Sequence, residues 1–258
     1  MGVVIALFNQ KGGVGKTTTC ANLCAGLALH NKKVLCVDFD PQSNLSGGLG
    51  VDRRSLEKTV YDVLLGNEKA EDCIIKGNIE GLDILPASID LAGAEIEISN
   101  VEKRETVLKR ALAGIIDKYD YIIIDCPPSL GLLPVNALAV CSHVLIPIQC
   151  EYYALEGVSQ LINTVNLVKR SLNPKLDVVG VLLTMFDSRT NLSHQVAGEV
   201  KHFFGSKVFN TIIPRNVRLA EAPSHGMTIF EYDKQSKGAE AYYNVAGELI
   251  KRMEVENG

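Results

Sequence analysis

The chain has 258 residues, of which 47% are hydrophobic and 22% charged, and its formal net charge is −4. This composition predicts a globular protein with a sizeable core and excludes a surface that is basic overall. No apolar run approaches the roughly 20 residues of a membrane-spanning helix, and the amino end does not resemble a signal peptide, so we expect a soluble, cytoplasmic protein.

Short apolar runs recur along the chain, each followed by a loop and then a helical pattern. The predicted strands are 3–8, 34–40, 82–86, 121–128, 143–148 and 177–184. The predicted helices are 17–30, 101–117, 130–140, 154–171, 191–204 and 238–253. Because the apolar runs are continuous, they suit strands that are buried on both faces. The sequence thus predicts the α/β class, with a mostly parallel sheet, helices on both faces and a single domain over residues 1–258.

Residues 45–81 have weaker strand signals, and they predict loops and short helices over one edge of the sheet.

The seven cysteines are scattered along the chain, and none forms a CxxC pair. We interpret them as buried, reduced cysteines of a cytosolic protein, with a redox or metal role as the alternative.

The stretch FNQKGGVGKTTT, residues 8–19, joins the first predicted strand to the first predicted helix. The usual phosphate-binding pattern, G-x-x-x-x-G-K-[ST], has glycine where this chain has Gln10, and Lys11 comes next. Glycines let backbone N–H groups wrap a phosphate, and the amino end of a helix adds partial positive charge. We therefore predict a nucleotide site, with Lys16 at the β- and γ-phosphates and the Thr17 hydroxyl on Mg²⁺.

Aspartates close two further predicted strands. In DFDPQSN, Asp38 and Asp40 stand at positions i and i+2 of a strand, so both can face the phosphates. One of them would approach the metal and the other the water that attacks the γ-phosphate. The run IIIDCPPS places Asp125 where a Walker B acid holds Mg²⁺ or its waters.

Together, KGGVGKTTT, VDFDPQSN and IIIDCPPS resemble the deviant-Walker family of ATPases. TMFDSRTNLS and TIIPRNVRLAEAPSHG narrow the resemblance to the short ParA/Soj-type partition ATPases, over essentially the whole chain. The resemblance implies a P-loop ATP hydrolase with weak intrinsic activity. It also implies a nucleotide-sandwich dimer in which Lys11 reaches the phosphates of the partner's ATP, as an arginine finger does.

The resemblance further implies a role for each site residue. Asp40 positions the attacking water, Thr18 contacts the α-phosphate, and Asp125 supports Mg²⁺. The implied catalytic residues are Lys11, Lys16 and Asp40, and the implied metal residues are Thr17, Asp38 and Asp125. The implied nucleotide-binding residues are Lys11, Gly12, Gly13, Val14, Gly15, Lys16, Thr17 and Thr18, with Met185, Pro214 and Asn216 lining the adenine pocket.

The family's function implies three partners: a second copy of the chain, non-specific double-stranded DNA, and a ParB/Spo0J-type centromere-binding protein that stimulates slow hydrolysis. Residues 189–218 hold five cations against Glu199 alone, so positive charge is concentrated there. The resemblance makes Arg189 and Arg218 DNA contacts, whereas Lys201 and Lys207 join them only as spatial guesses. We expect nucleoid association, and no helix-turn-helix domain ahead of the first strand.

Other functions remain as alternatives. A MinD-like positioning ATPase would bind membranes through an amphipathic carboxyl-terminal helix. In this tail, glutamates at 248, 254 and 256 offset Lys251 and Arg252, so we expect a helix packed on the domain and no membrane partner. An electron-transfer relative with a shared cluster, or a small-molecule kinase or synthetase, would use the same loop differently.

Overall fold

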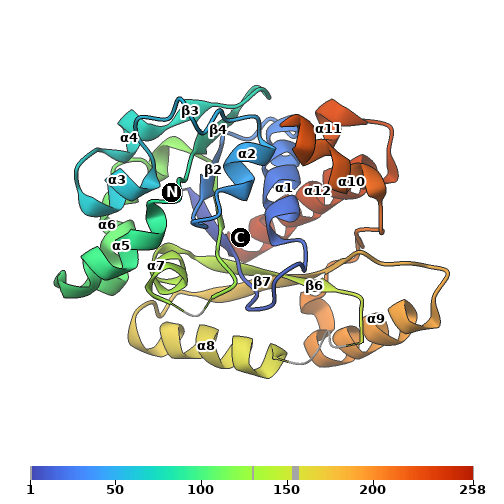
Figure 1. Ribbon diagram of the computed structural model, residues 1–258. Helices are drawn as coiled ribbons and strands as arrows, with labels where there is room; N and C mark the ends of the chain where they lie inside the picture. The colour runs from blue at the N-terminus through green and yellow to red at the C-terminus, as the bar shows by residue number, and fades with distance from the viewer. Residues whose placement is uncertain (1, 130, 153–156, 258) are drawn as a thin grey trace.

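The computed structural model describes residues 2–129, 131–152 and 157–257, and it contains a seven-stranded sheet in the order β3-β4-β2-β5-β1-β6-β7 (Figure 1). The strands are β1 (Val3–Leu7), β2 (Val34–Asp38), β3 (Ile75–Lys76), β4 (Leu82–Leu85), β5 (Tyr121–Asp125), β6 (His143–Gln149) and β7 (Asp177–Thr184). Only the pairing of β3 with β4 is antiparallel among the described strands. The predicted mostly parallel α/β sheet is confirmed.

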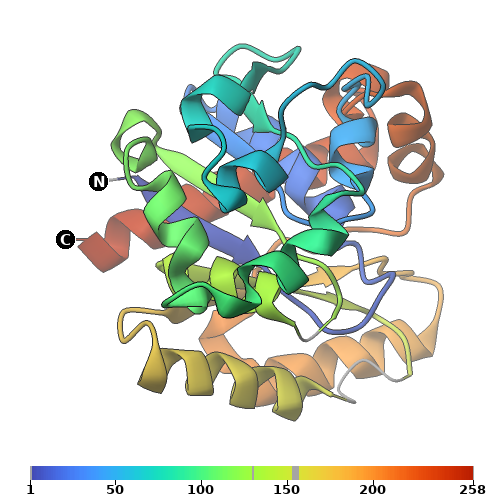
Figure 2. The same ribbon diagram turned by 60° about the vertical axis from the view of Figure 1, so that its left-hand side comes forward.

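Helices cover both faces of this sheet (Figures 1 and 2). The long helices are α1 (Lys16–Leu29), α7 (Leu132–Val140), α8 (Val158–Ser171), α9 (Asn191–Phe204) and α12 (Lys237–Asn257). Helices α1 and α12 pack on one face, and α7, α8 and α9 lie on the other. Successive residues of each strand enter opposite clusters, as Val4 and Ile5 do, because strand side chains alternate between faces.

Shorter elements surround this frame. The short helices are α2 (Asn44–Gly48), α3 (Val60–Leu65), α4 (Ala70–Cys73), α5 (Leu91–Glu97), α6 (Val107–Leu112), α10 (Val217–Glu221) and α11 (Ile229–Tyr232). Turns of 3-10 helix lie at Ile98–Asn100, Arg104–Thr106, Ile116–Lys118, Gly205–Lys207 and Ala222–His225. Over the described ranges, no helix has both the length and the apolar character needed to cross a bilayer.

The predicted elements differ from the structure in a few places. Residues 45–81 form loops and short helices as predicted, but they also contain the edge strand β3. The single helix predicted over 101–117 is wrong, because only α6 within it is α-helical and Lys103 takes a left-handed conformation with φ 55. Residue 130 and residues 154–156 of two other predicted helices lie outside the described residues.

The register of the sheet brings the strand ends together. Asp125, the last residue of β5, lies opposite Leu7 of β1 and opposite Asp38 of β2. In a parallel sheet, the carboxyl ends of the strands share one edge, and ligands bind in the crevice beyond it. The loop after β1 and both strand-end aspartates therefore lie at the same edge.

Candidate nucleotide site

The loop between β1 and α1 has the backbone geometry of an anion cradle. Gly13 and Gly15 have φ values of 75 and 86, in the left-handed region that glycine adopts freely. A Cβ added at Gly12 or Gly13 would meet no atom within 4 Å, so the loop surface is open there. Gly15 is the N-cap of α1, and Lys16 is the first residue of that helix. The amino end of the helix adds its own partial positive charge to that of Lys16.

Hydrogen bonds from neighbouring strands hold this loop in place. The Asn9 side chain donates to Pro147 O at 2.8 Å and accepts from Lys11 N at 3.0 Å. The Thr184 hydroxyl donates to Val14 O at 2.9 Å. Asn9 and Thr184 were not predicted as site residues, although each is a polar residue at the end of a buried strand.

The two lysines of the loop have different environments. Lys16 is 7% exposed, and its ammonium donates to Lys11 O at 3.1 Å. Burial lowers the pKa of Lys16, while the carboxylates of Asp125 and Asp40 oppose that shift. In the part of the chain that the structure describes, the Lys11 ammonium makes no hydrogen bond or ion pair. By contrast, the backbone N–H of Lys11 donates to Asn9, and its backbone carbonyl accepts from Lys16.

Asp38 is fully buried at the end of β2 and organises the loop that follows. Its Oδ2 accepts from Ser46 N at 2.7 Å and from Ser46 Oγ at 2.6 Å, and its Oδ1 accepts from Asp40 N at 3.3 Å. Burial raises the pKa of Asp38 to about 6, even though these hydrogen bonds favour the charged form. Ser46, which also accepts from Ala87 N at 3.1 Å, was not foreseen from the sequence.

Asp125 has a polar atom that the protein leaves unsatisfied. It is 1% exposed, and its Oδ1 is the one buried side-chain oxygen or nitrogen of the described residues without a hydrogen-bond partner. Burial and the nearby Asp38 raise its pKa, whereas a hydrogen bond from the Thr17 side chain lowers it. A buried carboxylate oxygen of this kind is suited to a hard cation such as Mg²⁺, with the Thr17 hydroxyl beside it.

Asp40 stands at the accessible side of the same edge. It is half-buried, and its Oδ1 accepts from Gln42 N at 2.9 Å. Arg53 fixes the loop from outside, since its Nη1 donates to Gln42 O at 3.3 Å and to Ser43 Oγ at 3.1 Å. Asp40 is therefore held close enough to Lys16 to interact electrostatically, yet it is open to solvent.

A cavity of about 330 Å³ adjoins the loop and contains the predicted adenine residues. The Phe186 N–H donates to Ile213 O at 3.0 Å, and the Phe186 carbonyl accepts from Arg215 N at 2.9 Å. These bonds bring the segment after β7 beside the IPRN stretch, residues 213–216. The lining residues are Gly15, Thr18, Thr184, Met185, Ile213, Pro214, Arg215, Asn216, Val217, Leu219, Ala220 and Tyr242. The structure thus joins Met185, Pro214 and Asn216 to the phosphate loop.

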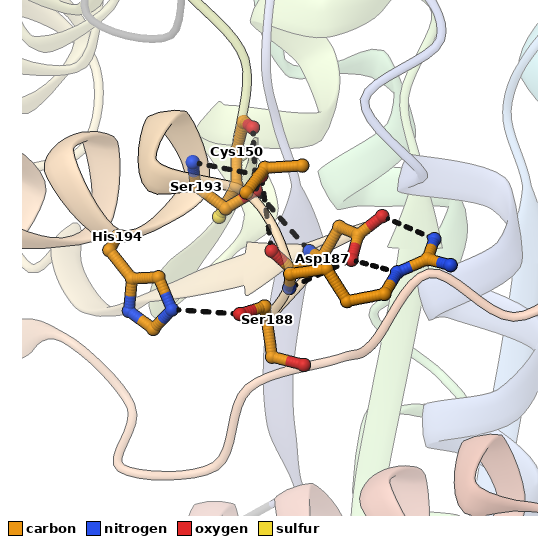
Figure 3. A network of polar contacts seen from close by, with 7 residues as sticks. Cys150, Asp187, Ser188, Ser193 and His194 are labelled. Atoms are coloured by element: carbon orange, nitrogen blue, oxygen red, sulfur yellow. Dashed lines mark hydrogen bonds and ion pairs between the residues drawn. The ribbon is translucent and has the colours of Figure 1, made fainter.

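The predicted DNA contacts lie on exposed segments near this edge. Arg189, with an 86% exposed side chain, donates to both carboxylate oxygens of Asp187, at 2.9 and 2.7 Å. Figure 3 shows Asp187 in the polar network that also holds Ser193, at the start of α9. Arg218, 55% exposed, pairs with Glu221 at 2.9 Å on α10.

The two spatial guesses, Lys201 and Lys207, do not share this edge. Lys207 pairs at 2.8 Å with Asp177, the first residue of β7, and so lies at the opposite end of that strand. Lys201 lies in the last turn of α9, which leads through a 3-10 turn to Lys207. These cations were wrongly grouped with Arg189, because a helix that follows a strand carries the chain back to the other edge.

Comparison with known proteins identifies the family of the chain. A family model described as an AAA domain matches residues 2–178. The sporulation initiation inhibitor protein Soj of Bacillus subtilis is 57% identical, over 96% of this chain and 98% of that protein. The chromosome partitioning protein ParA of Myxococcus xanthus is 52% identical, over 98% of this chain and 89% of that protein.

Two solved structures share the fold. Cobyrinic acid a,c-diamide synthase from Mycobacterium smegmatis, with bound ADP and magnesium, has a TM-score of 0.88 at 40% identity, covering 98% of this chain and 96% of that one. The septum site-determining protein MinD from Pyrococcus horikoshii, complexed with Mg-ADP, has a TM-score of 0.81 at 28% identity, covering 99% and 98%. Identity above one half, sustained over nearly the whole length of this chain and its relatives, shows that the protein belongs to the Soj/ParA chromosome-partitioning ATPases of the AAA-domain family.

Proposed function

We propose that this chain is an ATP-dependent DNA partition ATPase whose active site is complete only between two copies. The contrast between the two loop lysines carries the proposal. Lys16 is buried among the acids of its own site, whereas the ammonium of the half-buried Lys11 makes no hydrogen bond or ion pair within the described residues. A loop with one in-house lysine leaves phosphate charge unneutralised in the transition state, and Lys11 of a second copy supplies the missing charge.

The substrate is ATP with Mg²⁺. Gly12–Thr18 wrap the phosphates, the 330 Å³ cavity takes the adenine, and Lys16 orients the β- and γ-phosphates. Thr17 and Asp125 hold Mg²⁺, which supplies neutralising charge when bound. Because Ser46 occupies Asp38 Oδ2, Asp38 acts mainly by placing the loop that carries Asp40.

Asp40 positions the attacking water. Its carboxylate is accessible at the phosphate edge, and the loop around it is fixed by Asp38 from within and by Arg53 from outside. A carboxylate held in this way accepts a hydrogen bond from water and aims its lone pair at the γ-phosphate. Hydrolysis is slow in one chain alone, since the site lacks the second copy's Lys11.

The ATP-bound dimer binds double-stranded DNA without sequence preference. Arg189 and Arg218 from both copies would neutralise backbone phosphates and release counterions, which makes binding sensitive to salt. Hydrolysis separates the copies and frees the DNA, so ATP times the attachment to the nucleoid. A ParB/Spo0J-type centromere-binding protein would accelerate that step in the cytoplasm.

The MinD-like membrane alternative is disfavoured by the environment of the carboxyl-terminal helix. Arg252 of α12 donates to Val208 O at 2.8 Å and to Glu248 Oε1 at 2.9 Å, and its guanidinium lies 4.2 Å from the centre of the Phe209 ring. Leu249 is fully buried. The apolar face and one of the two tail cations are therefore engaged by the protein and unavailable to a bilayer.

Binding to a random-sequence DNA duplex, with ATP, ADP or no nucleotide at one stated salt concentration, tests this function. We expect binding with ATP alone, weakening as salt rises. Absence of binding at low salt, with ATP occupancy verified, would rule out the DNA-partition function. Binding to anionic liposomes under the same conditions would then support the MinD-like alternative.

A further inference from the structure

We infer that three buried cysteines, Cys20, Cys24 and Cys36, form a binding site for one soft, thiophilic metal ion, monovalent copper. Their three sulfur atoms all lie within 4.8 Å of one another. The Cys20 and Cys36 sulfurs are 3.8 Å apart. The three cysteines are not among the residues assigned to the nucleotide site, and the inference does not rest on the partition function.

Two elements bring the thiols together. Cys20 and Cys24 stand four residues apart on α1, so they share one face of that helix. Cys36 lies in β2, against which α1 packs (Figures 1 and 2). The sequence does not reveal this convergence, because none of the three cysteine pairs has the CxxC spacing of common metal sites.

The spacing of the sulfurs matches metal coordination. Sulfurs bound to one ion at about 2.3 Å must lie about 3.8–4.0 Å apart in a tetrahedral or trigonal arrangement. The Cys20–Cys36 separation already has this value, and the upper limit of 4.8 Å for the other pairs requires at most small side-chain rotations. An ion would therefore bind without a rearrangement of the backbone.

The ligand set selects the ion. Thiolates are soft donors, which favour monovalent copper and zinc over magnesium or calcium. Structural zinc takes four ligands, and no fourth cysteine, histidine or carboxylate of the described chain joins the three sulfurs. All three cysteines are fully buried among apolar side chains, so water does not supply a fourth ligand. Three thiols together in the buried interior thus suit three-coordinate copper.

The location gives metal binding a physical consequence. Lys16 opens α1 one turn before Cys20, and Asp38 ends β2 two residues after Cys36. An ion bridging α1 and β2 would clamp the helix that carries the phosphate-binding lysine onto the strand that carries the loop-organising aspartate. Each coordinating thiol releases its proton to solvent, and the ion enters when α1 opens locally from β2.

The test is anaerobic titration of the full-length protein with monovalent copper in competition with a chromophoric copper chelator. We expect one ion per chain and a melting temperature that rises with copper concentration, because the folded state alone holds the three thiols together. Cys24→Ala should weaken copper binding at least tenfold. Cys141→Ala is the matched control, since Cys141 is equally buried but outside the cluster, and it should bind as the wild type does.

X-ray absorption at the copper edge of the wild-type protein keeps the test independent of any variant that fails to fold. Three sulfur neighbours around one copper would support the site. Two sulfur neighbours, equal copper affinity of Cys24→Ala and Cys141→Ala, or tight binding of zinc but not of copper would each overturn it.

Discussion

At the scale of single residues, burial changes the pKa values of the charged groups at the sheet edge. Lys16 and Asp125 are both nearly inaccessible, and each interacts with the other's charge. Desolvation alone would favour the neutral form of both groups. Of the two groups, Asp125 has an oxygen, Oδ1, without a hydrogen-bond partner among the described residues, and in the proposed function Mg²⁺ would satisfy it while the phosphates would neutralise Lys16.

Lys16→Ala should weaken ATP binding about 10- to 100-fold, because a charge-assisted contact to the phosphates is lost. Lys109→Ala, at an exposed position on α6, is the control and should leave the affinity unchanged. Equilibrium dialysis with ATP and Mg²⁺ measures both. Equal affinity of the two variants would show that the phosphate site lies elsewhere.

The raised pKa of Asp38 should make the free energy of unfolding depend on pH. Its pKa of about 6 in the folded protein exceeds the ordinary aspartate value of 3.8, so the folded protein keeps a proton that the unfolded chain releases first. This contribution is complete below about pH 4 and is lost as the pH rises through 6, a change of about 3 kcal/mol.

Urea unfolding of wild type and Asp38→Asn, without Mg²⁺, measures this effect. The difference in free energy of unfolding, wild type minus variant, should fall between about pH 4 and 6 and stay flat above pH 7. A difference that is constant across that range would mean that the carboxylate titrates in the native protein as it does in the unfolded chain.

At the scale of elements, the sequence predicted the helices and strands with long periodic patterns. The helix predicted over 191–204 coincides with α9, because its apolar positions, its Thr190 cap and Gly205 at its end all agree. The region 101–117 was different, since its helical composition conceals a backbone reversal at Lys103 that propensity does not reveal. Short elements such as β3 and α10 depend on contacts with distant segments, which no local pattern contains.

Helix α12 is fixed to the sheet through Arg252, whose guanidinium also donates to Val179 O and Lys207 O at 3.2 Å each. Arg252→Ala should lower the free energy of unfolding by about 2–3 kcal/mol, since Glu248 and several carbonyls lose a charged donor. The neighbouring exposed Lys251 provides a control whose alanine variant should change stability by less than about 0.5 kcal/mol. Chemical denaturation of both proteins compares them, and equal stabilities would show that α12 is held by its apolar face alone.

At the scale of the whole molecule, motif order in the sequence predicted which residues meet at the nucleotide site, but not how charge is distributed around it. Asp38 and Asp125 are 87 residues apart yet lie in register on adjacent strands. By contrast, Lys207 is close to Arg189 in sequence, and an intervening helix carries it to the opposite edge. The net charge of a sequence segment therefore does not predict whether its charged side chains share one surface, unless the path of the chain is known.

Reversing charge at the two edges distinguishes a local DNA surface from a general electrostatic effect. Arg189→Glu should weaken ATP-dependent DNA binding at least tenfold while dimerisation with ATP persists. Lys201→Glu changes the net charge equally at the far edge, and it should bind DNA nearly as the wild type does. Fluorescence anisotropy with a random duplex measures both, and equal losses would refute a surface confined to the Arg189 edge.

In the proposed dimer, Lys11 of one copy completes the active site that contains Asp40 of the other copy. ATP hydrolysis should be nearly abolished in Lys11→Ala and in Asp40→Ala when each variant is alone. In an equimolar mixture, half of the randomly paired dimers are mixed, and each has one intact site, so about a quarter of the wild-type rate should return. If Lys11 acted within its own chain, every site in the mixture would lack one of the two residues. A mixture no more active than the separate variants, with mixed dimers verified by a tag on one variant, would contradict the account.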